Sequence, residues 1–331
     1  MDYKIQEKFN DLHIKPISLV ITGQVKSRIE IAGGLEKVAE NLNNFKKIHP
    51  ENEIIISTFN GQQVSQIDEI SDITIINSDP GPDYFRVQPW PIANRKSNQY
   101  VNYSRMFTTA ISGLSACKNT IVIKTRIELI PDDCTKFKDW LSICIDGIGE
   151  NSNRVGLFIE HYNGIIFSID GTLGTLPATL LIAEKSNLLE IYTRSKQMWD
   201  RNFLAYTRKK FLFPVTDEQI LGLSYLSIVA NFNLDSVINK VKRYYISREL
   251  ISAIQKTEKC KLVYTKYSES GFTKNYFAGS SYIKVPSTLN YQSRLQTIFA
   301  LIIVVLKRYK HMSRRMTIGL KKRYESRVNI W

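Results

Sequence analysis

The first 130 residues alternate short apolar runs with stretches of helical spacing. Runs of apolar and β-branched residues predict four buried strands, at Ile17–Thr22, Glu53–Phe59, Asp72–Asn77 and Thr120–Thr125. Between them, apolar residues recur every three or four positions and predict helices over Gly34–Ile48 and Tyr100–Cys117. This alternation predicts an α/β fold, with a mostly parallel Rossmann-type sheet flanked by helices. Because such sheets bind ligands at the carboxyl ends of their strands, the segments after each strand are the candidate site.

Beyond Pro131 the pattern is less regular. Helices are predicted over Phe137–Ile145, Thr175–Tyr192, Thr216–Ala230 and Leu234–Ile254, and strands over Arg154–Glu160 and Gly164–Ile169. A long helix is predicted from Ser293 to about Glu325. No clean linker precedes about Asn290, so we expect one domain over residues 1–290 and a tail over residues 291–331.

The formal net charge of +14 is distributed unevenly along the chain. From Lys259 to Trp331 there are fifteen Lys or Arg against two acids, whereas the preceding 258 residues hold thirty against twenty-nine. The predicted tail helix carries an apolar stripe formed by Ile298, Ile302, Val305, Tyr309, Met312, Met316 and Leu320. An apolar stripe backed by cations is typical of an amphipathic helix lying on an anionic membrane surface. Packing on the domain and a short coiled coil are the alternatives, but an unrelieved basic face would repel its copy in a parallel pair.

Composition points to a cytoplasmic protein that does not cross a membrane. The longest apolar run, Ile298–Leu306, would form a helix of roughly 13 Å, against a hydrocarbon core of about 30 Å. The N-terminal segment is polar and is no secretory signal, and the four cysteines form no CxxC pair, which favours a reducing compartment. We therefore expect a cytoplasmic protein, peripheral on the inner face of the cytoplasmic membrane.

Several familiar catalytic and binding motifs are absent from the sequence. There is no P-loop, no GxGxxG after the first predicted strand, no GxSxG and no HExxH. A stretch rich in Tyr and Lys, from Tyr264 to Tyr291, could stack on sugars or on nucleobases, although a solvated surface layer explains it more simply. A nucleic-acid binder would be expected to spread cations over the whole folded face, so we predict no nucleic-acid partner.

The fourth predicted strand runs into two cations and a carboxylate, Lys124, Arg126 and Glu128. Charged groups at the mouth of a parallel sheet are costly to desolvate unless they face a ligand or one another. They could hold a divalent cation and the phosphates of a ligand. Alternatively, Arg126 and Glu128 form an ion pair that closes the strand end, and the residues alone do not decide between these readings.

Five motifs in order make the sequence resemble a known family. They are Ile17–Gly23, Pro50–Phe59, Asp79-Pro80-Gly81, Asn102-x-x-Arg105 followed by Gly113-Leu114, and Lys124-Thr125-Arg126-Ile127-Glu128. This succession resembles the WavE lipopolysaccharide-synthesis family of bacterial surface-polysaccharide proteins, and Asp217–Leu221 is similar to the family's Glu-Gln segment. The resemblance is good over Ile17–Pro131, patchy to about Ala230 and absent beyond. It implies a GT-A-like fold and a glycosyltransferase.

The resemblance also implies a donor site for a nucleotide-sugar. Its first-strand loop (Thr22, Gly23, Gln24) would face the base or ribose, and Asp79, Pro80 and Gly81 would form the next wall. Arg105 would meet phosphate, and Lys124 and Arg126 would stabilise the leaving diphosphate. Glu128 stands where the family usually has Asp, as the expected ligand of Mg²⁺ or Mn²⁺; glutamate moves the charge about one bond outward, so metal use and activity both remain open.

Two carboxylates are candidates for the general base that would deprotonate an acceptor hydroxyl. Asp170 follows a predicted strand, where an ordinary Asp-Gly turn is the alternative. Glu218 lies at a predicted helix start beside a capping-box spacing, Thr216-x-x-Gln219, so it is either the base or a favourable charge at the helix N-terminus.

The predicted function is transfer of a sugar from a nucleotide-sugar to a lipopolysaccharide, capsule or related surface glycan. The alternatives are a non-catalytic protein that binds an anion or a nucleic acid, and an inactive relative of the glycosyltransferases.

Overall fold

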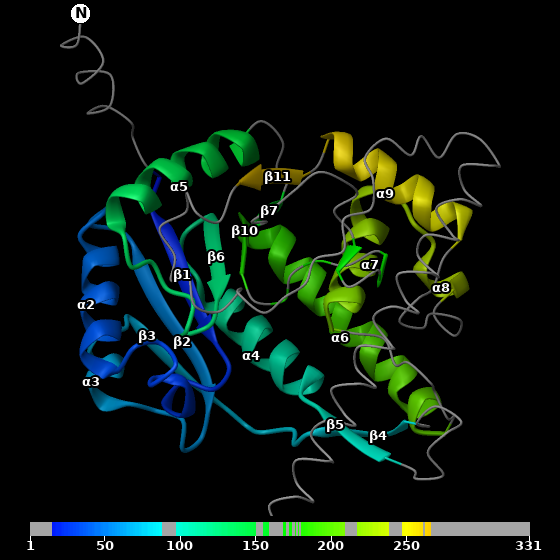
Figure 1. The fold of residues 1–331 in the computed structure, drawn as a ribbon, viewed down its shortest axis with the longest axis horizontal. Coiled ribbons are helices and arrows are strands. Elements are labelled where there is room, and N and C mark those ends of the chain that lie inside the picture. The colour runs from blue at the N-terminus through cyan, green and yellow to red at the C-terminus, as the bar shows by residue number, and fades with distance from the viewer. Residues whose placement is uncertain are drawn as a thin grey trace, which may run out of the picture.

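The fold is built on a central sheet in which an apolar strand, β1 (Ile17–Thr22), lies between two parallel neighbours (Figure 1). The structure is a computed structural model, and it describes residues 15–87, 97–149, 155–158, 168–169, 172–173, 176, 178, 180–208, 217–237, 247–260 and 262–265. Within those residues the main sheet has seven strands in the order β11-β7-β10-β6-β1-β2-β3. The predicted tail, residues 291–331, lies outside the described part of the chain.

The four strands predicted at the N-terminal end are confirmed. Besides β1 they are β2 (Glu53–Phe59), β3 (Ile73–Asn77) and β6 (Ile121–Thr125), and β1 pairs in parallel with both β2 and β6. The register places Thr22 opposite Ser57, and Ile21 opposite Thr125. The carboxyl ends of three neighbouring strands therefore meet at one edge of the sheet, as the α/β pattern predicts.

The far half of the sheet departs from the predicted pattern. Strand β10 (Leu181–Glu184) lies within a stretch predicted as helix and runs antiparallel between β6 and β7 (Val155–Phe158). Its apolar residues are buried, and a short apolar run of this kind cannot be assigned to strand or helix by spacing alone. Strand β11 (Leu262–Thr265) then pairs in parallel with β7.

Two pairs of antiparallel strands complete the described strands. One joins β4 (Asp83–Val87) to β5 (Ser97–Val101), and neither strand was predicted. The other joins β8 (Ser168–Ile169) to β9 (Thr172–Leu173), at the end of a segment predicted as strand.

Helices cover both faces of the sheet. One core holds the inward residues of α2 (Leu35–Lys46), α3 (Ser65–Ile70) and α5 (Cys134–Gly149), which pack against Ile17, Leu19 and Ile21 of β1. The opposite core contains Val20 of β1 together with residues of α4 (Tyr103–Ala116), α6 (Lys185–Arg208), α7 (Asp217–Val229) and α9 (Arg248–Cys260). The alternate residues of β1 therefore face opposite sides of the sheet, both of which are covered, and every residue of the strand is buried.

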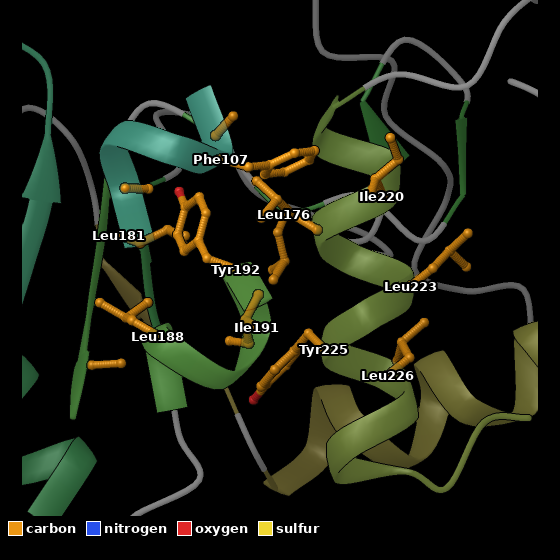
Figure 2. Packing of buried hydrophobic residues seen from close by; sticks show 14 of the residues in the cluster. Phe107, Leu176, Leu181, Leu188, Ile191, Tyr192, Ile220, Leu223, Tyr225 and Leu226 are labelled. Carbon is orange, nitrogen blue, oxygen red and sulfur yellow. The ribbon is translucent and has the colours of Figure 1, made fainter. Parts of the chain in front are cut away.

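Helices α4, α6 and α7 form the second core around large side chains. Figure 2 shows Phe107 of α4, Ile191 and Tyr192 of α6, and Tyr225 of α7 in one cluster between these helices. Helix α7 is buried on all sides from Gln219 to Leu226, and its N-terminal end reaches the carboxyl edge of the sheet. It matches the predicted helix. Of the next predicted helix, over Leu234–Ile254, the described residues form α8 (Leu234–Val237) and the first part of α9, and residues 238–246 lie outside the described part of the chain.

Helix α4 approaches the sheet closely because Gly113 has no side chain. A Cβ atom at this position would lie 2.6 Å from Cγ1 of Val20 and 3.1 Å from Cβ of Ser57. The glycine therefore sets the distance between α4 and strands β1 and β2.

Among the described residues, no helix is both long and apolar enough to cross a membrane.

Candidate functional site

A pocket of about 160 Å³ opens at the carboxyl ends of β1, β2 and β6. Its lining comes from the loop after β1, the end of β2, the start of α4, the loop after β6 and the start of α7, and consists of Thr22, Gly23, Gln24, Arg28, Phe59, Asn102, Tyr103, Arg105, Met106, Thr109, Arg126, Glu128 and Asp217. Six of the predicted donor-site residues are among them: Thr22, Gly23, Gln24, Arg105, Arg126 and Glu128. The sheet topology brings together segments that are more than 190 positions apart in the chain.

The loop after β1 is held in place by backbone and hydroxyl hydrogen bonds. Thr22 Oγ1 donates to the carbonyl of Thr125 at 3.1 Å, and the amide of Gly23 donates to the carbonyl of Ser57 at 3.0 Å. Thr58 Oγ1 donates to the carbonyl of Gly23 at 2.7 Å. Gly23 has φ +95°, a left-handed conformation that glycine adopts without the strain of a side chain. The loop therefore presents a fixed backbone surface to the pocket.

Glu128 is buried beneath the pocket and paired with two arginines. Its side chain is only 1% exposed, and its Oε1 accepts a hydrogen bond from Nη1 of Arg28 at 2.8 Å. Nη1 of Arg126 lies 3.9 Å from the same oxygen. Burial of an unpaired carboxylate costs several kcal/mol, so the two arginines stabilise Glu128 in its buried position. The ion pair of Arg126 with Glu128, one of the two readings of this motif, is present.

Arg28 was not among the predicted site residues. It lies in a short 3-10 helix, η1 (Lys26–Arg28), and meets Glu128, which is one hundred positions later in the chain. No local motif marks it, because only the pairing of β1 with β6 brings the two segments together.

Arg105 reaches the pocket from the first turn of α4 and is fixed by Asp79. Its Nε and Nη2 donate to Oδ1 and Oδ2 of Asp79 at 2.6 and 2.5 Å, and its Nη1 donates to Oδ1 of Asn102 at 3.0 Å. The hydrogen bond from Arg105 is the main cause that lowers the pKa of Asp79. Asp79 also accepts from the amide of Gly81 at 2.9 Å, which closes the predicted turn. Asp79, Pro80 and Gly81 do not line the pocket themselves; Asp79 acts on it through Arg105.

The start of α4 is held by a second carboxylate that was not predicted. Asp83 is buried and accepts from the amide of Ser104 at 2.8 Å and from Nε1 of Trp199 at 3.2 Å. It therefore satisfies an N-terminal amide of α4 and ties that helix to α6. This contact positions the helix turn that carries Arg105.

Lys124 does not lie where its predicted role requires. Strand alternation turns it away from the pocket and into the core, where its side chain is fully buried. Its Nζ donates to the carbonyl of Ala178 and lies 5.5 Å from the centroid of the Tyr192 ring. Desolvation lowers the pKa of Lys124 to about 7, with Arg126 adding to the shift. Lys124 therefore supports the pocket from behind and makes no contact with its interior.

The carboxylate of α7 that lines the pocket is Asp217, next to the predicted Glu218. Glu218 is half-buried and its carbonyl accepts the amide of Leu176 at 2.8 Å, but its side chain is not part of the lining. Asp170, the other predicted base, lies outside the described residues. Two adjacent acids at a helix start were visible in the sequence, and only the packing of α7 shows which one faces the pocket.

The residues present at Glu128 do not fit a divalent cation well. To bind a divalent cation, Glu128 would have to become exposed and lose its ion pair with Arg28. The cation would also be repelled by the guanidinium groups of Arg28 and Arg126. Within the part of the chain that the structure describes, no group of three His, Cys, Asp or Glu side chains could hold a metal ion. The expected Mg²⁺ or Mn²⁺ site remains a prediction from the resemblance alone.

Comparison with known proteins supports the family resemblance over the N-terminal part of the chain. A family model described as WavE lipopolysaccharide synthesis matches residues 17–130, the segment that contains most of the pocket lining. No curated protein matches the sequence.

Solved structures give only distant likenesses. A 4-diphosphocytidyl-2C-methyl-D-erythritol synthase from Anaerococcus prevotii is 15% identical, with 86% of this chain and 96% of that chain covered and a TM-score of 0.35. The galactosyltransferase LgtC, in complex with donor and acceptor sugar analogues, is 15% identical over 62% of this chain and 69% of that one, with a TM-score of 0.33. The glycosyltransferase GlyE of Streptococcus pneumoniae is 12% identical over 72% and 56%, with a TM-score of 0.32. All three TM-scores are below 0.5, so these structures do not by themselves establish a shared fold.

Proposed function

We propose, from the match of residues 17–130 to the WavE lipopolysaccharide-synthesis model, that the protein is a GT-A-like glycosyltransferase of surface-polysaccharide synthesis. Its donor would be a nucleotide-sugar bound at the carboxyl ends of β1 and β6, and its acceptor a lipopolysaccharide, capsule or related surface glycan. The observation that carries this proposal is the pocket itself. Three arginines, Arg28, Arg105 and Arg126, line it, and all three fall within the matched segment.

The proposed reaction is displacement at the anomeric carbon of the donor sugar. A bond forms from the acceptor oxygen to this carbon, the bond to the diphosphate oxygen breaks, and the nucleotide diphosphate leaves with the electron pair. Guanidinium groups preorganised at the pocket would stabilise the charge that develops on the leaving group. Arg126 and Arg28 suit this role because Glu128 holds them at the strand ends.

The proton of the acceptor hydroxyl needs a base within hydrogen-bond reach. Glu128 is enclosed by arginines, which leaves Asp217 as the other carboxylate among the described lining residues. We therefore propose Asp217 as the base in place of its neighbour Glu218. Asp170 stays a candidate on the sequence pattern alone.

A panel of nucleotide-sugars tests the donor site. Thermal unfolding is measured with UDP-, GDP-, CDP- and CMP-sugars, each with Mg²⁺, with Mn²⁺ and with EDTA. A ligand at a hundred times its dissociation constant stabilises the fold by about 2.7 kcal/mol, enough for a clear shift of the melting temperature. The nucleotide that responds is then tested for sugar transfer to a lipid-linked or free glycan acceptor.

The outcomes separate the proposal from its rivals. No response to any nucleotide-sugar refutes the donor site and favours a different anion. A response without transfer or donor hydrolysis, in the presence of candidate acceptors, favours the inactive relative. Asp217→Asn should abolish transfer while the nucleotide still binds, and Glu218→Gln serves as its matched control at the adjacent position.

The proposed location is the inner face of the cytoplasmic membrane, reached through the basic tail. It rests on the charge pattern of residues 291–331, which carry the predicted amphipathic stripe. A peripheral position of this kind would suit a transferase with a lipid-linked acceptor.

A further inference from the structure

We infer that Arg28 and Arg126 take the place of a divalent cation in this pocket, and that Glu128 is the buried anchor that positions Arg28. The inference rests on the proposed function and deepens it in two ways. It adds Arg28 as a residue that binds the donor's diphosphate, and it predicts that binding needs no metal.

The geometry of Arg28 suits a phosphate-binding group. One of its terminal nitrogens, Nη1, donates to Oε1 of Glu128 at 2.8 Å, while its side chain remains 32% exposed and lines the pocket. A guanidinium has five N–H donors in a fixed plane, so the anchoring bond leaves several for another acceptor. A planar cation held by a buried carboxylate is preorganised to bind a phosphate through charge-assisted hydrogen bonds.

Glu128 is placed as an anchor for cations within the protein. Its side chain is 1% exposed, and Oε2 is buried with no hydrogen-bond partner among the described residues. A carboxylate so enclosed is stabilised by Arg28 and Arg126 and presents no open face to an ion from solvent. The three side chains together carry one net positive charge, which faces the pocket through the partly exposed guanidinium groups.

Arg105 does not supply this charge in the same way. Its Nε and Nη2 lie within 2.6 Å of the carboxylate oxygens of Asp79, so that ion pair is close to neutral as a unit. The positive charge on this side of the pocket is therefore carried by the cluster of Arg28, Arg126 and Glu128, while Asp217, at the start of α7, contributes a separate negative charge to the lining.

Isothermal titration calorimetry on the full chain tests the inference. The probes are UDP, GDP, CDP and inorganic pyrophosphate, each measured in EDTA and again in Mg²⁺ or Mn²⁺. We expect binding in EDTA, with a dissociation constant that the metal changes by less than about threefold. Arg28→Gln should raise this constant by about 10- to 100-fold, the loss expected for a charge-assisted hydrogen bond to phosphate.

Two further variants control for folding and for general charge loss. Arg28→Lys keeps the charge and should bind more tightly than Arg28→Gln but less tightly than the wild type. Arg194→Gln removes another arginine that is paired with a glutamate, at 2.9 Å from Glu190 and outside this pocket, and should leave binding unchanged. Equal binding by Arg28→Gln and wild type would overturn the inference, as would a metal effect larger than about threefold.

A double-mutant cycle tests whether Glu128 acts through Arg28. We expect the effect of Arg28→Gln on the dissociation constant to shrink in the Glu128→Gln background, because the anchor is then absent. Additive effects would show that Glu128 does not position Arg28.

The probes also separate this inference from the proposed function. Nucleotide binding that occurs only with metal overturns the inference and leaves the donor site standing. Arg28-dependent binding of pyrophosphate in EDTA, with no binding of any nucleotide, supports the anion cluster and refutes the donor site. Absence of binding by every probe overturns both.

Discussion

The position of Lys124 can be tested directly, because the structure buries its ammonium group in the core and not in the pocket. The side chain is fully buried, donates to the carbonyl of Ala178 and lies beside the Tyr192 ring. Burial lowers the pKa of Lys124 from 10.5 to about 7 in the folded protein. Lys124→Met keeps a side chain of similar length and removes the charge.

The magnitude follows from the difference between the folded and unfolded pKa values. Between pH 7 and 10.5 the unfolded chain binds more protons at Lys124 than the folded protein does, so wild-type stability rises with pH across this window. One pKa unit corresponds to about 1.4 kcal/mol, and from pH 7 to pH 9.5 the wild type should gain about 3 kcal/mol from this group. The methionine variant has no such gain.

The variant also loses a hydrogen bond. The Ala178 carbonyl is left buried without its donor, at a cost of about 1–3 kcal/mol at every pH. The charge penalty that Lys124→Met removes at pH 7 is about 4 kcal/mol, so the variant should be the more stable protein there by about 1–3 kcal/mol. Near pH 9.5 this advantage should have disappeared.

Urea unfolding followed by circular dichroism at several pH values between 7 and 9.5 measures this difference. Other titrating groups act on both proteins, so the comparison between variant and wild type isolates Lys124. A difference that stays constant with pH would refute the reasoning, because it would mean that Lys124 keeps its ordinary pKa in the fold. The variant should also bind the nucleotide as the wild type does; loss of binding with an intact fold would return Lys124 to the role in donor binding that its motif suggested.

Three other changes test separate parts of the structure. Gly113→Ala should destabilise the fold by about 1–3 kcal/mol in urea unfolding, since its Cβ would lie 2.6 Å from Val20. Ser115→Ala, on the exposed face of the same helix, is the control and should change stability by less than about 0.5 kcal/mol. Equal effects of the two substitutions would argue against the close approach of α4. Arg126→Ala should slow transfer by roughly a hundredfold, about 3 kcal/mol in the barrier, and should lower the stability of the ligand-free protein much less than that, because Arg28 still pairs with Glu128; a grossly unstable variant that binds donor normally per folded molecule would favour a purely structural ion pair. In flotation with anionic and neutral liposomes, full-length protein should float with anionic vesicles and a truncation after Asn290 should not; equal flotation of both would contradict the predicted tail.

Much of the site could be predicted from the sequence because its parts lie directly after recognisable strands. The apolar runs that form β1 and β6 have the same bounds, within one residue, as the predicted strands. The carboxyl ends of parallel strands must share one edge of the sheet, so the loop at Thr22 and the charged motif at Glu128 were expected to meet. The structure places both at the same pocket.

Predictions failed where the outcome depends on partners far away in the chain. Leu181–Glu184 was predicted as helix, yet it forms β10 because β6 and β7 offer two edges to which its backbone can bond. Asp83 shows no local sign of a role, and only the packing of α6 brings Trp199 to it. Long-range contacts of this kind outweigh local spacing for short segments.

The sequence by itself determined the parallel half of the sheet and the chemical character of its carboxyl edge. Apolar periodicity is a local property, and the order of strand and helix leaves few ways to connect them. The tertiary structure alone decided which charges face a ligand. Lys124 and Arg126 are two positions apart at the end of β6. Lys124 enters the core, because side chains alternate between the two faces of the sheet as far as Thr125. Arg126 lies beyond the last residue of the strand and lines the pocket. Glu128 turns toward Arg28, a partner one hundred residues away, because a buried carboxylate is stable only where the fold supplies a cation.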